Sequence, residues 1–365
     1  MTDQTAYRSE VVGSLLRPAY LANARKQYES GQLGAVELKK IEDRAVDEAI
    51  TLQEAAGCDV VTDGEMRRYA FYGHFTDAFD GYDRYGGIRI PFRNEQGEQL
   101  AHPLPVLVDR LKWRRSMCAE EWVYLRARAS HPIKMTMVDA TLGAGYYDPV
   151  KSKSAYANFD EYMAELIDFC RREIDELVRL GCTYIQIDAP HYMVQLDPQW
   201  REEARQHGED PDKTLARYID IDNAIIDGHP GVIFAMHFCR GNNQSMFAGT
   251  GNYELVSQIF TRSHFQRFLL EYDDERSGGF EPLRHVPDDR FVVLGLVSSK
   301  KPQLESPKEL KQRIKEATRY IPLERLALSP QCGFASTQAG NRLTIEEERH
   351  KLELVTQVAR EIWGA

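Results

Sequence analysis

Four side chains that could bind a metal stand at the ends of apolar runs in the C-terminal part of the chain. His237 and Cys239 lie two residues apart at the end of the run GVIFAMHFC. Glu271 ends the run RFLLE, and Cys332 follows the run RLALSP. Because side chains alternate along a strand, His237 and Cys239 should point to the same side. One imidazole, two thiolates and a carboxylate suit tetrahedral Zn²⁺. The alternative from spacing alone is that the cysteines are buried and inert.

The chain alternates short apolar runs with amphipathic stretches. We expect eight strands, near residues 11, 59, 134, 184, 232, 267, 291 and 326. Helices are expected over residues 35–56, 159–180, 212–227, 253–263, 306–320 and 344–363. The strands are almost continuously apolar, as buried parallel strands are. The sequence therefore predicts an α/β fold, a TIM (β/α)8 barrel, with a doubly wound open sheet and a cap as the alternative.

Residues 69–131 do not follow this rhythm. The part between residues 81 and 104 is rich in Gly, Pro and Arg, with hairpin-like turns. We interpret residues 69–131 as an insertion or cap after the second strand, with irregular structure and one helix. An insertion of this size is more often functional than idle. The expected organisation is a single zinc-binding catalytic domain over residues 1–365 that contains this insertion.

Composition excludes several classes of protein. The chain has 365 residues, with 46 basic and 56 acidic side chains and a formal net charge of −10. No block of basic residues indicates nucleic-acid binding, and no apolar run is long enough to cross a membrane. The N-terminus has no apolar signal-peptide core, and the six cysteines are scattered without a CxxC pair. We therefore expect a cytoplasmic protein with reduced thiols.

Further candidates follow the other strands, because a TIM barrel carries its chemistry at the carboxyl ends of its strands. Ser14, Glu65 and Asp188 follow the first, second and fourth expected strands. Less specific candidates for contact with a substrate are Arg17, His74, His191, Lys300 and Arg240. For these, the alternatives are a packed loop histidine and ordinary surface cations.

The chain resembles the catalytic half of cobalamin-independent methionine synthase, and most closely its short, stand-alone bacterial members (methionine synthase II-like). The resemblance runs over nearly the whole chain. It rests on the segments VVGSLLRP, VVTDGEMRR, YIQIDAP, HFCRGN, FLLEYDDERSGGFEPL and LSPQCGFAST, which begin at residues 11, 60, 184, 237, 268 and 328.

This resemblance implies a TIM barrel and Zn²⁺ held by the four ligands named above. It implies that the backbone of Ser14 binds the carboxylate of homocysteine and that Glu65 and Asp188 bind its amino group. The implied activity is a methyl transfer to the homocysteine thiol that gives methionine. Two thiolates and a carboxylate make the metal a poor Lewis acid for splitting water. Such a site is well suited to bind a substrate thiol, remove its proton and keep the sulfur nucleophilic. The substrate sulfur could displace Glu271, the hardest ligand.

Two departures from the family bear on the methyl donor. Lys300, in VSSKKP, stands near the position of the family's active-site histidine, and TMVDATLGAGYY lacks the tryptophan that packs against folate. At this length we also expect no second barrel of the kind that helps long members hold a polyglutamylated folate.

The expected partners are therefore a homocysteine-like thiol and a methyl or alkyl donor, with no nucleic acid and no membrane; a homo-oligomer is compatible with the sequence. The alternatives are an alkyltransferase for another thiol, similar to epoxyalkane:coenzyme M transferase, and a zinc-binding protein without turnover. A sulfonate thiol would need cations near Arg17, Arg240 or Lys300.

Overall fold

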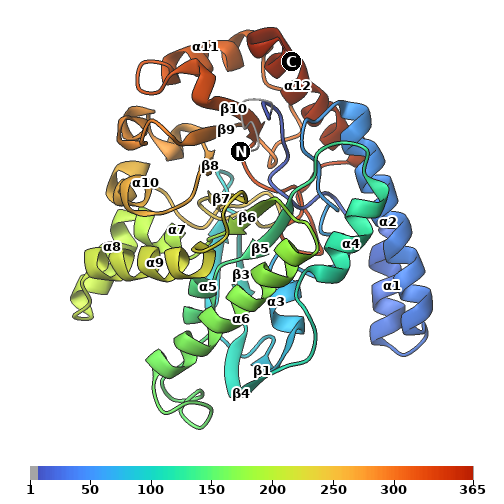
Figure 1. Ribbon diagram of the computed structural model, residues 1–365, viewed down its shortest axis with the longest axis vertical. Helices are drawn as coiled ribbons and strands as arrows, with labels where there is room; N and C mark the ends of the chain where they lie inside the picture. The colour runs from blue at the N-terminus through green and yellow to red at the C-terminus, as the bar shows by residue number, and fades with distance from the viewer. Residues whose placement is uncertain (1–6, 365) are drawn as a thin grey trace.

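The computed structural model describes residues 7–364, which form an α/β fold around a six-stranded parallel sheet (Figure 1). The strands are β5 (Met135–Val138), β6 (Tyr184–Asp188), β7 (Ile233–Phe238), β8 (Arg267–Glu271), β9 (Phe291–Val297) and β10 (Leu326–Pro330). Their order in the sheet is β10-β9-β8-β7-β6-β5, so neighbours in sequence are neighbours in space. Nearly every residue in these strands is buried. The six strands predicted from residue 134 onward are confirmed.

The first two predicted strands are present only as isolated bridges. Parallel bridges join Ser9 to Leu328, Glu10 to Val60, and Val61 to Ile133. The prediction of regular strands near residues 11 and 59 is therefore wrong. Each segment offers only one or two residues in ladder geometry before its chain turns at Gly13 or Gly64. The bridges nevertheless place these two segments between β10 and β5.

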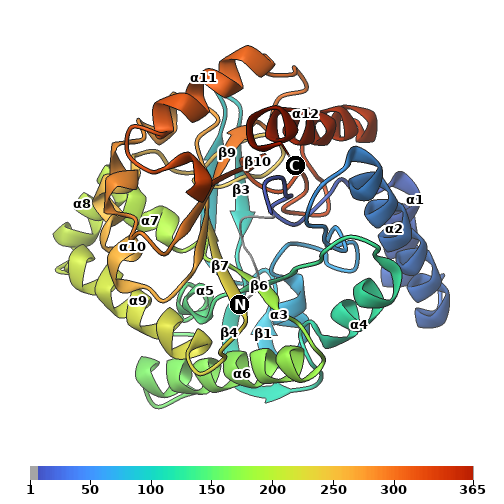
Figure 2. The same cartoon turned by 45° about the horizontal axis from the view of Figure 1, so that its top comes forward.

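Helices surround the sheet (Figure 2), where α2, α4, α6, α9, α10, α11 and α12 follow one another around its periphery. The longer helices are α1 (Ala19–Glu29), α2 (Ala35–Ala56), α4 (Ala119–Arg128), α6 (Phe159–Arg179), α8 (Pro198–Gln206), α9 (Pro211–Ile226), α11 (Pro307–Ala317) and α12 (Ile345–Trp363). The short ones are α3 (Gly73–Asp77), α5 (Ala140–Ala144), α7 (Tyr192–Leu196) and α10 (Gln258–Arg262). Within residues 7–364, no helix combines the length and apolarity needed to cross a membrane.

The region expected to be irregular contains two small antiparallel sheets as well as α3 and α4. Strand β1 (Phe79–Asp83) pairs with β4 (Val106–Trp113), and β2 (Arg89–Arg93) pairs with β3 (Gln99–Pro103). The prediction of irregular structure with one helix is wrong for these segments. In β2 the larger apolar residues, Ile90 and Phe92, alternate with exposed neighbours, which is the pattern of a strand with one covered face.

A buried ion cluster lies where several strands begin. The Glu10 carboxylate accepts hydrogen bonds from Lys134 Nζ at 2.6 Å, from Arg267 Nε at 2.8 Å and from the Tyr184 hydroxyl at 2.9 Å. The side chains of Glu10, Lys134 and Arg267 are fully buried. The cluster joins the N-terminal segment to the starts of β6 and β8. It therefore stabilises the end of the sheet opposite the carboxyl ends of the strands.

Candidate metal centre and substrate pocket

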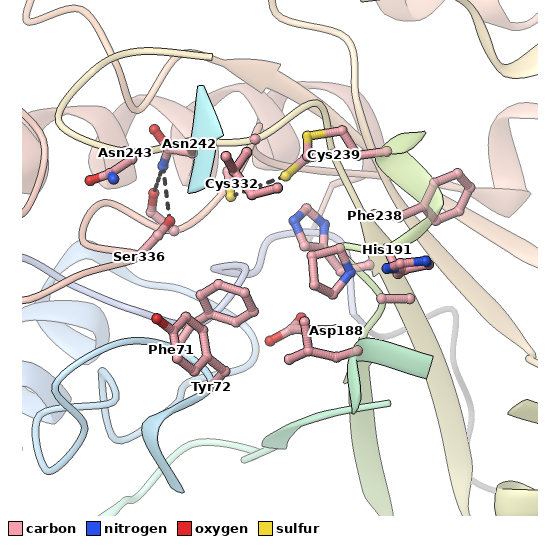
Figure 3. Close-up of a pocket in the computed structure, with 18 of the residues that line it drawn as sticks. Phe71, Tyr72, Asp188, His191, Phe238, Cys239, Asn242, Asn243, Cys332 and Ser336 are labelled. Carbon is pink, nitrogen blue, oxygen red and sulfur yellow. Dashed lines mark hydrogen bonds between the residues drawn. The ribbon is translucent and has the colours of Figure 1, made fainter. Parts of the chain in front are cut away.

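Three of the predicted metal ligands meet at the carboxyl ends of β7 and β10 (Figure 3). One ligand atom each from His237, Cys239 and Cys332 lie within 4.8 Å of one another, and all three residues are buried. The two Sγ atoms are 3.8 Å apart. His237 lies in β7, Cys239 directly follows it, and Cys332 follows β10 by two residues. The parallel sheet thus brings together donors that are 93 positions apart in the chain.

The imidazole of His237 is oriented by the neighbouring strand. Its Nδ1 lies 3.1 Å from the Leu269 carbonyl oxygen of β8. A carbonyl only accepts, so Nδ1 carries a proton, and in the neutral ring Nε2 keeps its lone pair. Within the described part of the chain, this buried Nε2 has no hydrogen-bond partner. A buried acceptor of this kind beside two sulfur atoms is suited to a cation.

The two thiols titrate as a pair. The hydrogen bond from Cys332 to Cys239 holds the pKa of Cys239 well below its usual range. The same contact raises the pKa of Cys332 well above it. The contact therefore favours ionisation of Cys239 and opposes that of Cys332. A bound divalent cation would replace the proton between the two sulfurs.

The Glu271 carboxylate lies close to these donors but is bonded to nitrogen atoms. Its Oε2 accepts a hydrogen bond of 2.6 Å from the backbone N–H of Arg240, the residue that directly follows Cys239. Its Oε1 lies 3.2 Å from Lys300 Nζ and 3.2 Å from an Arg276 guanidinium nitrogen. Burial opposes ionisation, but the surrounding cations lower the pKa of Glu271 to about 2. The structure thus places Glu271 beside the three-donor group, as an ionised carboxylate.

A cavity of about 170 Å³ opens next to the donors. Ser14, Glu65 and Asp188 line it together with His237, Cys239 and Cys332. Figure 3 shows Asp188 facing the two cysteines, with Phe71 and Tyr72 across from it. The site therefore combines sulfur ligands and carboxylates in one small, largely apolar space.

Glu65 and Asp188 give this cavity its negative character. Burial raises the pKa of both carboxyl groups, that of Glu65 to about 7. Glu65 Oε1 accepts from the Thr136 hydroxyl at 2.9 Å, whereas its Oε2 has no partner in the described part of the chain. Asp188 Oδ1 accepts from the Gln186 amide at 2.7 Å. Two acids facing one cavity would bind an ammonium group, which restores their ionised form.

Of the less specific candidates, His191 lines the cavity, whereas the others lie elsewhere. His191 lines the cavity, donates or accepts at 2.9 Å with the Tyr218 hydroxyl, and has its pKa lowered to about 4 by burial. Arg17 does not line it; its guanidinium donates to the backbone carbonyls of residues 65, 68, 335 and 337. Arg240 is likewise turned away, toward the Gly251 carbonyl at 2.6 Å. Lys300 is bound to Glu271, as described above.

His74 lines a second, polar cavity of about 690 Å³, together with Arg67, Arg68 and Arg115. Neither ring nitrogen of His74 has a partner among the described residues. Burial and the nearby Arg68 hold the pKa of His74 well below its usual range. His74 is thus neutral and separate from the group around Cys239.

Sequence analysis did not identify several residues of the site. Phe71, Tyr72 and Phe92 line the cavity, as does Asn242, whose amide donates to the Gly333 carbonyl at 2.6 Å. The position of Asn242, three residues after Cys239, was the available signal for it. Phe92 comes from the region expected to be irregular, and only the alternation in RIPFR pointed to a covered face.

Comparison with known proteins gives one consistent family. The family described as "Cobalamin-independent synthase, Catalytic domain" matches residues 8–361. The uncharacterized protein YxjH of Bacillus subtilis (strain 168) is 33% identical over 362 residues, with 98% of this chain and 95% of that protein covered. The methionine synthase of Pyrococcus abyssi is 23% identical over 326 residues, with coverage of 89% and 86%.

Solved structures with the same fold were also found. A candidate vitamin-B12-independent methionine synthase from Listeria monocytogenes superposes with a TM-score of 0.75 at 26% identity, covering 98% of each chain. The B12-independent methionine synthase of Shewanella sp. W3-18-1, solved in complex with selenomethionine, gives a TM-score of 0.74 at 21% identity, again covering 98% of each chain.

Proposed function

The chain belongs to the family of cobalamin-independent synthase catalytic domains, and from this membership we propose that it transfers a methyl group to the thiol of homocysteine. The family implies a methyltransferase. The observation that carries the finer proposal is the placement of three sulfur and nitrogen donors beside two buried carboxylates in one cavity. The donors suit a thiol-activating metal, and the carboxylates suit an amino acid.

We propose Zn²⁺ as the cofactor, held by His237, Cys239 and Cys332, with Glu271 as the fourth ligand. The unpartnered Nε2 of His237 and the hydrogen-bonded pair of thiols, in which the pKa of Cys239 is lowered, fit this ion. Zn²⁺ in such a site supplies a lowered pKa for a substrate thiol and keeps its sulfur nucleophilic. Lys300 and Arg276 would hold Glu271 when the substrate sulfur takes its place.

The protein's own groups would orient the amino acid. Glu65 and Asp188 would accept hydrogen bonds from its ammonium group, and the Ser14 backbone would donate to its carboxylate. This keeps the thiol directed toward Cys239 and Cys332 and holds it in one position for attack. The cytoplasm, where the six free cysteines stay reduced, is the proposed compartment.

We also propose that the sheet closes into an eight-stranded (β/α)8 barrel. The three parallel bridges near residues 9, 60 and 133 support closure, because they connect β10 to β5 through the two N-terminal segments. Ser14 and Glu65 follow these segments, as they should if all eight carboxyl ends face one mouth.

The coenzyme M alternative is less well supported. A sulfonate needs cationic partners, but among the described residues that line the cavity none is Lys or Arg. The cations that the sequence offered for this purpose, Arg17, Arg240 and Lys300, are engaged elsewhere.

X-ray absorption on the zinc-loaded protein tests the proposal directly. Adding homocysteine should raise the number of sulfur neighbours of zinc by one at the expense of an oxygen neighbour. An unchanged sulfur number at saturating homocysteine would exclude thiol activation and favour a zinc-binding protein without turnover.

Asp188→Asn is expected to weaken homocysteine binding by roughly 10–100-fold, because a hydrogen bond to a charged group contributes about 1.5–3 kcal/mol. Zinc content should not change, since Asp188 is not one of the donors. Calorimetric titration with homocysteine measures the first quantity and elemental analysis the second. Equal affinity in the variant and the parent protein would remove Asp188 from the amino-group site.

Glu271→Gln is expected to lower zinc affinity by at least about 10-fold, because changes to groups next to metal ligands already cost 10–100-fold. The variant loses a carboxylate but keeps Lys300 and Arg276, so the surroundings of the metal become more positive. Competition with a chromogenic chelator measures the affinity. Glu254→Gln, which alters a surface carboxylate paired with Arg284, is the control; a loss of the same size there would show that the effect is not local.

A further inference from the structure

The β2–β3 hairpin extends across the carboxyl ends of the strands and is fastened to three loops there. Backbone hydrogen bonds of 2.8 and 2.9 Å join Arg93 to Phe247, which follows β7. Glu95, in the turn of the hairpin, lies 3.2 Å from Lys301, which follows β9. Glu98 pairs with Arg342, which follows β10. The hairpin, whose strand β3 is drawn in cyan in Figure 2, is thus held over the site at several points.

One face of this hairpin closes the cavity. Ile90, Phe92 and His102 of the two strands line it, together with the flanking Ile88 and Leu104. Phe92 packs with Met193, Met246 and Ala248 in a small apolar cluster. Arg89, Pro91 and Arg93 of β2 are exposed instead. The hairpin therefore presents apolar side chains to the site and keeps its arginines outside.

Apart from His237, a proposed zinc ligand whose pKa is raised, against burial, by its contact with Cys239, the ionisable groups that line the cavity are acidic or neutral. Among its described lining residues none is Lys or Arg, and the acids are Glu65 and Asp188. Burial lowers the pKa values of His102 and His191, so these rings are neutral at pH 7. Away from the Ser14 backbone, proposed above for the homocysteine carboxylate, an anionic group would lose its hydration without gaining a counter-ion, which costs several kcal/mol. Aromatic rings of Phe71, Tyr72 and Phe92 favour apolar or cationic groups instead.

We propose that the β2–β3 hairpin forms the roof of the second-substrate site and selects a compact alkyl donor that carries no anionic group. This inference rests on the proposed function, because it takes the thiol to be bound beside Cys239 and Cys332. A volume of about 170 Å³ is below the roughly 300–1,000 Å³ of pockets for larger ligands. The carboxylates of a polyglutamylated folate would find no Lys or Arg among the described residues that line this space.

The transfer balances for donors of this class. The substrate thiolate uses one electron pair to form the new S–C bond, and the bond between the alkyl carbon and its leaving atom breaks. From a sulfonium donor, the electron pair stays on the leaving sulfur, which departs as a neutral thioether. From an epoxide, it stays on the oxygen, which takes up the proton released from the thiol. Neither donor requires a cationic side chain in the cavity.

Two measurements test the roof. In the first, the zinc-loaded protein receives homocysteine with trimethylsulfonium, 1,2-epoxypropane or methyltetrahydropteroyltriglutamate, and S-alkylated product is quantified. We expect product from at least one compact donor and at least 10-fold less from the triglutamate. In the second, saturation-transfer NMR on the metal-free protein should show trimethylsulfonium bound and the triglutamate unbound.

Three variants distinguish effects of the hairpin on donor binding from effects on zinc and homocysteine binding. Ile90→Lys, which places a cation in the cavity, should reduce trimethylsulfonium binding at least 10-fold while zinc content and homocysteine affinity stay unchanged. Phe92→Ala should raise the KM for the compact donor with little effect on homocysteine affinity. Arg89→Ala, on the exposed face of the same strand, is the matched control and should behave like the parent protein.

The outcomes distinguish the two proposals. Efficient turnover with the triglutamate, unaffected by Ile90→Lys, would overturn the inference about the roof and leave the thiol methyltransferase intact. If the parent protein did not bind homocysteine, that result would instead contradict the proposed function itself.

Discussion

Cys332→Ala should leave the protein folded but unable to retain zinc, with an affinity loss of more than roughly 100-fold, since changes outside the ligand set already cost 10–100-fold. The variant removes one of two sulfur donors that lie 3.8 Å apart. His237 Nε2, Cys239 and the proposed ligand Glu271 would remain, and three donors with a single sulfur hold a tetrahedral ion less firmly. Elemental analysis after dialysis gives the stoichiometry, and the thiolate charge-transfer band of the Co²⁺-substituted protein reports sulfur coordination directly.

Cys170→Ala is the matched control for this experiment. Cys170 is fully buried in α6 and is not part of the donor group. The Cys170→Ala variant should bind one equivalent of zinc and, when loaded with Co²⁺, show the same charge-transfer band as the parent protein. A Cys332→Ala variant that kept full zinc affinity and full activity would refute the assignment of the metal centre.

Glu10→Ala is expected to destabilise the fold by about 3–5 kcal/mol, the cost of breaking a buried ion pair from one side. The substitution leaves the fully buried Lys134 ammonium without the carboxylate that it contacts at 2.6 Å. Such a loss is a large part of the roughly 5–15 kcal/mol by which domains are stable. Denaturant unfolding at pH 7 measures it. Asp220→Asn, which removes an exposed partner of Arg262, should change stability by less than about 1 kcal/mol.

The pH dependence of this difference follows from the same contacts. Burial raises the pKa of Glu10, but the positive charges of Lys134 and Arg267 outweigh this effect and lower it. A carboxyl group with a lowered pKa stabilises the fold fully above its unfolded pKa of about 4.3 and progressively less as pH falls through the folded value. The difference in free energy of unfolding between Glu10→Ala and the parent protein should therefore be constant from pH 6 to 8. It should become smaller below about pH 4. A gap that widened on acidification would contradict the ion-pair explanation.

The sheet could be predicted where the apolar runs were long. β5 to β10 are nearly fully buried, so their sequences are continuous apolar runs bounded by turns. The segments near residues 11 and 59 carry similar residues but form only single bridges. Hydrophobicity reports burial, and both segments are buried; it does not report how many ladder hydrogen bonds a segment makes. Two helices, α1 and α8, were not expected because few of their side chains are buried.

Sequence reasoning found the centre of the site more readily than its surroundings. His237, Cys239 and Cys332 were predictable because their chemistry and their positions at strand ends agree. Ser14, Glu65 and Asp188 were placed by resemblance to the family, and all three line the same cavity. The bonding of Lys300 to Glu271 depends on how the loop after β9 approaches the end of β8, and no local pattern encodes that. Hairpin-like turns were expected between residues 81 and 104, but the position of the hairpin over the site was not, since its covered face contacts loops that lie far away in the sequence.

The positions of the donors along the chain have a consequence for biosynthesis. A nascent polypeptide that has passed residue 239 carries one thiol and one imidazole of the centre, and the second thiol emerges only with residue 332. The last strand must then dock beside β9 before Cys332 reaches Cys239. Metal capture by this set therefore requires residue 332 to have left the ribosome and β10 to have paired with β9. Incomplete products that end before β10 would lack one sulfur of the proposed zinc site and should compete poorly for the ion.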